Sequence, residues 1–288
     1  MSYIKRLKHA FKNAPILPVN QKTKYVFFSD CHRGIGDNND NFLKNENEYI
    51  AALQYYYQYG FTYIEVGDGD ELWENRNLEL IMDMHNDVFS LLWQFYQNNR
   101  LYMLYGNHDM VKKYIDIFYE GIIMRAEHSQ STDNTDQKDI LVTHGHQVDF
   151  LNSTLWRLAR FLVRYLWTPL EYFGVQDPTS AAKNNILKSK SEQRLAKYAT
   201  DNSCILLTGH THRPMLLSDD LPLCNCGSCV HPRTVTCIEL CGTQISLVKW
   251  CSSTLSIQNG GHLSSMYNKC PPEYPVYITR EVITSHKL

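Results

Sequence analysis

The chain has 288 residues, of which 43% are hydrophobic and 20% are charged, and these values exclude an intrinsically disordered chain. Its 28 Lys and Arg residues nearly balance 30 Asp and Glu residues, so the formal charge is only -2. This balance provides no general attraction to nucleic acid, and any attraction to phosphate must be local. No stretch of the sequence approaches the length of a transmembrane helix.

The number of cysteines and the N-terminal sequence indicate the cellular compartment of the protein. Residues 1–20 contain basic side chains but lack the uninterrupted apolar run of a signal peptide. Nine cysteines, an odd number in a chain too large to need disulfide cross-links, indicate reduced thiols. A cytoplasmic location is therefore expected.

Short runs rich in β-branched and aromatic residues recur along the chain, and each ends in polar residues. The predicted strands are 25–29, 63–66, 101–105, 140–143 and 205–208. Between them, helices are predicted over 46–59 and 78–97, where apolar residues recur at helical spacing without proline. This alternation predicts one layered, largely parallel α/β domain over residues 1–288.

The pattern changes after residue 149. Residues 150–200 are predicted to form a helical cap inserted into the domain, in which apolar side chains are interspersed with Arg157, Arg160 and Arg164. A cap packed on the core is the favoured interpretation. The alternatives are a lid over an apolar substrate and a helix that gives peripheral contact with a membrane surface. Farther on, residues 234–240 and 244–250 predict a β-hairpin.

Side chains of the types that bind metals stand at the ends of the five predicted strands. The segments are Ser29-Asp30-Cys31-His32, Gly67-Asp68, Gly106-Asn107-His108-Asp109, His144-Gly145-His146 and Gly209-His210-Thr211-His212. Ligands of α/β folds bind beyond the carboxyl ends of strands. Carboxylate together with imidazole suits manganese, iron or zinc, whereas calcium and magnesium sites use oxygen almost alone. The sequence therefore predicts a transition-metal site at these strand ends.

The ordered motifs D-x-H, G-D, G-N-H-D, H-G and G-H-T-H resemble those of the calcineurin-like metallophosphoesterase superfamily. The resemblance implies a four-layer α/β/β/α sandwich of two mixed β-sheets flanked by helices, with two divalent metal ions. By motif, Asp30, His32 and His212 would hold the first ion, Asn107, His144 and His210 the second, and Asp68 would bridge them. His108 would bind the phosphate with Asn107 and protonate the leaving oxygen, and Asp109 would orient His108.

The implied reaction is hydrolysis of a phosphomonoester, phosphodiester or pyrophosphate bond by metal-activated hydroxide. The substrate would be a phosphorylated small molecule or a lipid-linked phosphate. A nuclease of the same superfamily is one alternative, and the near-neutral charge argues against it. A non-catalytic, metal-stabilised binding module is another, and the intact ligand set argues against that.

Residues beside the motifs have two interpretations each. Arg33 would clamp a phosphate through its planar guanidinium or form a surface salt bridge. Asp70 would add a ligand or, as is more common, cap a helix or orient a neighbour. His146 is expected to support the second ion from outside the ligand set. Cys224, Cys226 and Cys229 could join His231 in a zinc site, but their crowded spacing favours buried thiols.

The helical insert also resembles, in its place along the chain, that of UDP-2,3-diacylglucosamine pyrophosphohydrolase, a lipid-handling branch of the same superfamily. The run Glu71-Leu72-Trp73 after Asp68 is similar to that branch as well. The chain departs from it at His108 and His146, where that branch carries arginine and aspartate. The resemblance to this branch therefore leaves the substrate open.

Overall fold

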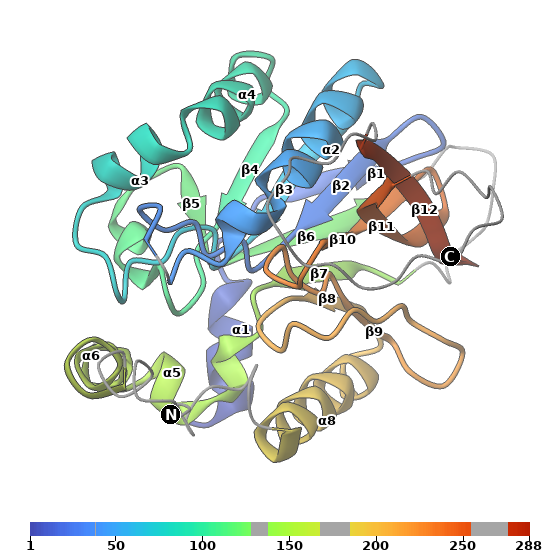
Figure 1. The fold of residues 1–288 in the computed structure, drawn as a ribbon. Helices are drawn as coiled ribbons and strands as arrows, with labels where there is room; N and C mark the ends of the chain where they lie inside the picture. Colours follow the sequence, from blue (N-terminus) through green and yellow to red (C-terminus); the bar gives the residue numbers. More distant parts are fainter. Residues whose placement is uncertain (38, 128–137, 168–184, 255–275) are drawn as a thin grey trace, which may run out of the picture.

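The computed structural model describes residues 1–37, 39–127, 138–167, 185–254 and 276–288. Two mixed β-sheets lie face to face, and helices cover the outer side of each (Figure 1). The fold is therefore the α/β/β/α sandwich that the motifs imply.

The larger sheet has seven strands among the described residues. In spatial order they are β12 (Val276–Lys287), β11 (Gln244–Thr254), β10 (Thr234–Cys241), β2 (Lys24–Phe28), β3 (Thr62–Val66), β4 (Leu101–Leu104) and β5 (Phe118–Tyr119). β2 to β5 run parallel, whereas β10, β11 and β12 are antiparallel to their neighbours. β10 and β11 form the predicted hairpin, and the positive φ of Gly242 (59°) permits its tight turn. These antiparallel additions make the sheet mixed.

The smaller sheet lies across the core from the larger one. Its strands are β1 (Ile16–Val19), β6 (Gly121–Ala126), β7 (Ile140–Thr143), β8 (Ile205–Thr208) and β9 (Leu223–Asn225), and only β6 and β7 pair antiparallel. Phe27 and Val66 of the larger sheet share one buried apolar cluster with Val142 and Leu207 of the smaller sheet. Each such side chain contributes about 1.5–3 kcal/mol on burial. This shared core holds the ends of β2 and β3 close to the ends of β7 and β8.

The outer helices pack on the sheets through separate apolar clusters. α2 (Glu46–Gln58) and α4 (Asn86–Gln97) lie on the larger sheet, with α3 (Leu78–Met84) beside α4, and α1 (Tyr3–Ala10) and α8 (Asn185–Asp201) lie on the smaller sheet (Figure 1). The helix predicted over 78–97 is two helices, because the backbone leaves helical geometry at His85. The buried His85 ring bonds Asp40 (2.9 Å) and Glu46 (2.7 Å), and these tertiary contacts override the local helical pattern.

The helical cap is shorter than predicted. Its described part consists of α5 (Phe150–Ser153), α6 (Trp156–Leu162) and the π-helical turn η4 (Val163–Trp167), while residues 168–184 of the predicted cap lie outside the described residues. α8 is an outer layer of the sandwich, because Leu195 and Ala199 are buried against the smaller sheet. The 3-10 helices η1 (Phe42–Asn45), η2 (Met110–Tyr114) and η3 (His146–Val148) lie in connections. In the part of the chain that the structure describes, every helix is too short or too polar to cross a membrane.

Candidate metal centre

The loops that follow β2, β3, β7 and β8 meet at one edge of the sandwich. The backbone N–H of His32 donates to the carbonyl of Asp68 (3.0 Å), which joins the loops after β2 and β3. In the smaller sheet, the N–H of Gly209 donates to the carbonyl of His144 (3.0 Å). Residues distant in sequence thereby reach one place.

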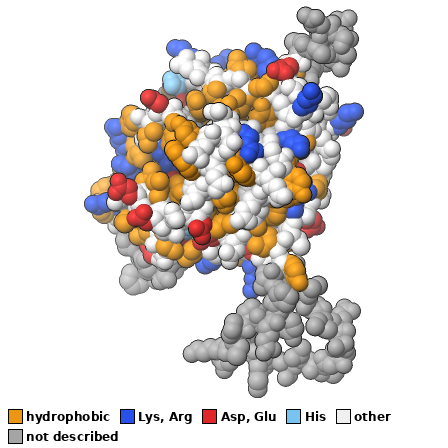
Figure 2. Space-filling model, turned by 90° about the horizontal axis from the view of Figure 1, so that it is seen from above, with side chains coloured by type: hydrophobic (Ala, Val, Ile, Leu, Met, Phe, Trp, Pro, Cys, Tyr) orange, Lys and Arg blue, Asp and Glu red, His pale blue; other side chains and the backbone are white. Residues whose placement is uncertain are grey.

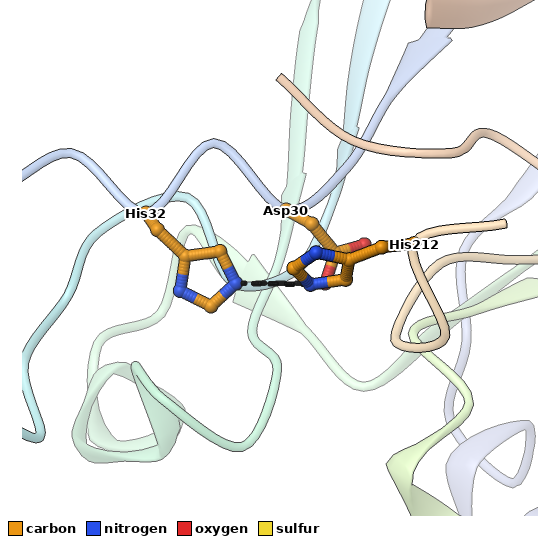
Figure 3. Close-up of side chains that lie close together, drawn as sticks. All are labelled: Asp30, His32 and His212. Carbon is orange, nitrogen blue, oxygen red and sulfur yellow. Dashed lines mark hydrogen bonds and ion pairs between the residues drawn. The ribbon is translucent and has the colours of Figure 1, made fainter. Parts of the chain in front are cut away.

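A first cluster contains Asp30, His32 and His212, whose side chains point toward one another (Figure 3). The Nε2 atom of His212 lies 3.1 Å from Oδ1 of Asp30 and 3.3 Å from Nε2 of His32. Oδ1 of Asp30 is buried and has no hydrogen-bond partner. Two imidazole nitrogens and one carboxylate oxygen thus converge where a cation fits.

A second cluster contains Asp68, His144 and His210. Nε2 of His144 lies 3.0 Å from Oδ2 of Asp68. The Nδ1 atom of His144 is 2.8 Å from the carbonyl of Val66, to which it donates, so Nε2 is the atom that would present a lone pair toward the cluster once the ring is neutral. This is the arrangement that a neutral imidazole needs in order to bind a metal.

Asp68 belongs to the second cluster and also lies near the first. Its Oδ2 is 3.0 Å from Nε2 of His144 and 4.0 Å from Nε2 of His32. Its Oδ1 accepts a hydrogen bond of 2.7 Å from the backbone N–H of His108. A Cβ at position 106 would stand 2.1 Å from that oxygen, so Gly106 is required there. A carboxylate in this position can bridge two ions, and bridging itself stays a prediction.

The donor set fits divalent cations. Three buried atoms of the predicted ligands lack hydrogen-bond partners: Oδ1 of Asp30, Oδ1 of Asn107 and Nε2 of His144. Buried polar atoms without partners are costly and rare, and a bound cation would satisfy all three. These residues can therefore hold metal ions.

Mutual electrostatics keep the carboxylates ionised. Burial raises the pKa of Asp30, but His212 and His144 lower it more, and the pKa is well below its usual range. The pKa of Asp68 is likewise raised by burial and lowered further by His144 and His108, so its net shift is downward. Burial lowers the pKa of His144, whereas Asp68 and Asp30 raise it, to about 9. Metal binding would therefore release protons from imidazole.

Left-handed backbone conformations recur at the centre. The residues with positive φ include Asp30 (55°), His32 (49°), Asp68 (50°), His210 (69°) and His212 (54°). This conformation is uncommon for residues with a Cβ and is found at sites where the surrounding structure imposes it. Each turn re-aims its side chain, so the ligands are not arranged by simple strand alternation.

Two carboxylates that sequence reasoning missed orient the histidines. Oε2 of Glu71 is 2.8 Å from Nδ1 of His32, and both carboxylate oxygens are 2.8 Å from Nδ1 of His108. Oδ2 of Asp149 is 2.7 Å from Nε2 of His210, which leaves Nδ1 of that ring for an ion. A carboxylate on the far nitrogen of a histidine ligand fixes its tautomer and orientation. Neither acid belongs to one of the five ligand motifs. Glu71 stands in the run Glu71-Leu72-Trp73 after Asp68, whereas the only signal for Asp149 is its proximity to His146.

Asp109 does not orient His108, contrary to the prediction. Its Oδ1 accepts from the N–H of Gly106 (2.7 Å), and its Oδ2 accepts from Gly69 (3.2 Å) and from Nζ of Lys112 (2.7 Å). Asp109 therefore supports the loops around Asp68, and Glu71 is the partner of His108. Burial raises the pKa of Glu71 but His108 and His32 lower it, to about 2, so this partner is ionised.

Arg33 is not placed to clamp a phosphate, and this prediction is wrong. Its guanidinium is fully buried, with Nε 2.6 Å from Oδ1 of Asp70 and the two terminal nitrogens 2.9 and 3.0 Å from Glu65. The alternative, a surface salt bridge, is also wrong because the pair is internal. Asp70 also binds Nζ of Lys112 (2.6 Å), so it orients neighbours, as its favoured interpretation has it.

His146 lies beside the second cluster, with its ring centroid 5.6 Å from that of His144. Burial and the charge of His144 place its pKa well below the usual range, so the ring is neutral. Its Nδ1 is buried without a hydrogen-bond partner. The expected supporting role stays a prediction.

The cysteine group consists of buried thiols. Cys224, Cys226 and Cys229 are fully buried, and none forms a disulfide. Sγ of Cys229 lies 3.4 Å from Sγ of Cys31. The candidate metal clusters found in the described ranges contain no cysteine, and the exposed His231 instead bonds the carbonyl of His212 (2.7 Å).

Comparison with known proteins gives only distant structural likeness. No family model matches the chain, and no curated protein matches its sequence. Vps29 of Chaetomium thermophilum is similar over 92% of this chain and 98% of its own, at 10% identity and a TM-score of 0.41. The cold-active protein-tyrosine phosphatase of a psychrophilic Shewanella is similar over 81% of this chain and 80% of its own, at 13% identity and a TM-score of 0.39. The site is therefore identified by this chain's own side chains.

Proposed function

We propose that the chain is a phosphoesterase that depends on two divalent metal ions. The observation that supports it is that two neighbouring clusters of ligand atoms, one of which contains Asp68, include buried atoms without hydrogen-bond partners. The proposed ligands are Asp30, His32 and His212 for one ion, Asn107, His144 and His210 for the other, and Asp68 for both. Manganese, iron and zinc suit this mixture of donors.

Ions bound there would polarise a phosphoryl oxygen and lower the pKa of water, so that hydroxide is available at neutral pH. The protein's own part is to bind, orient and protonate. Burial lowers the pKa of His108, but Glu71 and Asp68 raise it by more, so the net shift favours the protonated ring. Since Nδ1 of His108 bonds Glu71, Nε2 is left to donate a proton to the leaving oxygen. General acid catalysis of this kind contributes about 10²–10⁴-fold.

The proposed bond is a phosphomonoester, phosphodiester or pyrophosphate. We further propose that the substrate has an apolar part, since the cap exposes large apolar side chains. Leu158, Phe161 and Tyr165 are 49%, 57% and 54% exposed. The cap also adjoins the centre, because its Ala159 and Val163 pack on Trp73, which stacks on His108. A lipid-linked phosphate at or near a membrane surface matches this combination.

A nuclease is a weaker proposal. Basic and acidic side chains are interspersed on the face shown in Figure 2, and the formal charge is -2. A nuclease needs a continuous basic path for the phosphate backbone.

The described cysteines carry free thiols, which supports our proposal of a cytoplasmic location.

The test is turnover by the full chain, stripped of metal and then reloaded with Mn²⁺. The substrates are 4-nitrophenyl phosphate, bis(4-nitrophenyl) phosphate, and a pyrophosphate diester with either a short or a long acyl chain. The Asp68→Asn variant should lose activity and bound metal, whereas Glu48→Gln, a change at a buried acid that bonds Ser252, should retain both. Absence of turnover on every substrate by the loaded wild-type chain would rule the proposal out.

A further inference from the structure

Glu71 connects two histidines with different proposed tasks. One carboxylate oxygen is 2.8 Å from Nδ1 of His32, a proposed metal ligand, and both oxygens are 2.8 Å from Nδ1 of His108, the proposed acid. A carboxylate can only accept, so both rings donate from Nδ1. Each Nε2 then points away from Glu71, one toward the first metal cluster and one toward the expected leaving oxygen.

Trp73 fixes the plane of the His108 ring. The two rings are stacked with centroids 4.2 Å apart and an interplanar angle of 22°. Trp73 is only 3% exposed and packs against Ala159 and Val163 of the cap. His108 is thus held at one edge by Glu71 and on one face by Trp73, both from the loop after Asp68.

The cap forms hydrogen bonds with the backbone of the loop after Asp68. Arg164, in the π-helical turn η4, donates to the carbonyls of Trp73 (2.6 Å), Leu72 (2.9 Å) and Asn75 (3.2 Å). Three bonds from one guanidinium to one short segment restrict its movement. π-helical turns within helices are often found at functional sites.

We infer that Glu71 is a positioning residue that orients His108 and His32 together, and that Arg164 of the cap holds the loop that carries it. The inference rests on the proposed function for the roles of the two histidines, but the coupling of their rings through Glu71 does not. It also predicts that loosening of the cap disturbs the acid without removing any ligand.

The first experiment needs no turnover. In the metal-free full chain labelled with ¹⁵N-histidine, two Nδ1 protons bonded to a carboxylate should give far-downfield resonances. Glu71→Gln should shift both resonances together, and the control Glu48→Gln should shift neither. Arg164→Met, which leaves Glu71 in place, should broaden the His108 resonance more than that of His32. Unchanged resonances in Glu71→Gln, or movement of only one, would overturn the inference.

The second experiment uses leaving groups and metal content. With the Mn²⁺-loaded chain, Glu71→Gln should lower kcat on an alkyl phosphate by about 10- to 100-fold, the usual effect of losing such a partner. 4-Nitrophenyl phosphate should be much less affected, because its leaving group needs no proton, and Glu71→Asp should recover part of the loss. Equal loss on both substrates, or loss of one whole ion from the Glu71→Gln variant at saturating Mn²⁺, would show that Glu71 is a ligand instead. If the wild-type chain is inactive but Glu71→Gln shifts both histidine resonances, the proposed function is refuted and the positioning role of Glu71 is retained.

Discussion

Replacement of Arg33 by Met tests the buried charge network beneath the metal centre. Arg33 and Glu65 are fully buried, and Asp70 is 1% exposed, so the substitution leaves two internal carboxylates with one cation fewer. Removing one partner of a buried ion pair costs about 3–5 kcal/mol. At about 2–4 °C per kcal/mol, the melting temperature should fall by about 6–20 °C.

The assay is thermal unfolding followed by circular dichroism, with Arg125→Met as the matched control. Arg125 pairs with Asp139 at the surface, where the side chains are 51% and 32% exposed, and such pairs contribute about 0–1 kcal/mol. Adding Glu65→Gln to Arg33→Met should restore part of the loss, as expected for coupled neighbours. If Arg33→Met is as stable as Arg125→Met and has a raised KM for a phosphate ester, the role of Arg33 in a buried charge network is refuted. Phosphate binding by Arg33 would then be supported.

Other perturbations follow from the same contacts. Chelation of metal should lower the melting temperature of wild type but not of Asp68→Asn, as measured by calorimetry, because an ion that binds only the folded chain stabilises it. Asp149→Asn, which removes the partner of His210 Nε2 at 2.7 Å, should weaken metal affinity about 10- to 100-fold in a competition titration; unchanged affinity would remove Asp149 from the site. Burial lowers the pKa of His85 but Asp40 and Glu46 raise it by more, so its stabilising contribution is present below the unfolded pKa of about 6.5 and is lost as pH rises through the folded value. The stability lost in His85→Gln, measured by urea unfolding, should therefore shrink toward alkaline pH, and growth of that loss would contradict this sign.

Much of the fold can be predicted from the local pattern of apolar and polar residues in the sequence. The strands observed at Ile140–Thr143 and Ile205–Thr208 have the predicted bounds, because a continuous apolar run between polar segments defines a buried strand. The break at His85 was not readable, since it depends on Asp40 and Glu46, about 40 residues away in sequence. The assignment of α8 to the cap failed for a similar reason: its buried face contacts strands that sequence spacing does not identify.

The candidate site also has parts that the sequence predicts and parts that it does not. The proposed ligands follow strands closely, so the convergence of the six that lie in the two clusters, all except Asn107, was predictable from the parallel order of the strands. The supporting acids were not predictable, because Glu71 and Asp149 lie in irregular segments and meet histidines 37 to 61 residues away. Arg33 was misjudged because a sequence does not tell whether an arginine beside a motif turns outward or inward.

The positive φ angles at Asp30, His32, Asp68, His210 and His212 have a consequence for the order of assembly. Conformations that side-chain sterics disfavour persist only where the rest of the fold enforces them. Backbone hydrogen bonds hold these turns within the sandwich, for example from the N–H of Asp30 to the carbonyl of Gly67 (3.1 Å) and from the N–H of His32 to the carbonyl of Asp68 (3.0 Å), so we expect the apoprotein to retain its tertiary structure. A metal ion would then bind to the folded protein and exchange without unfolding it. This differs from domains that fold only when their ion binds.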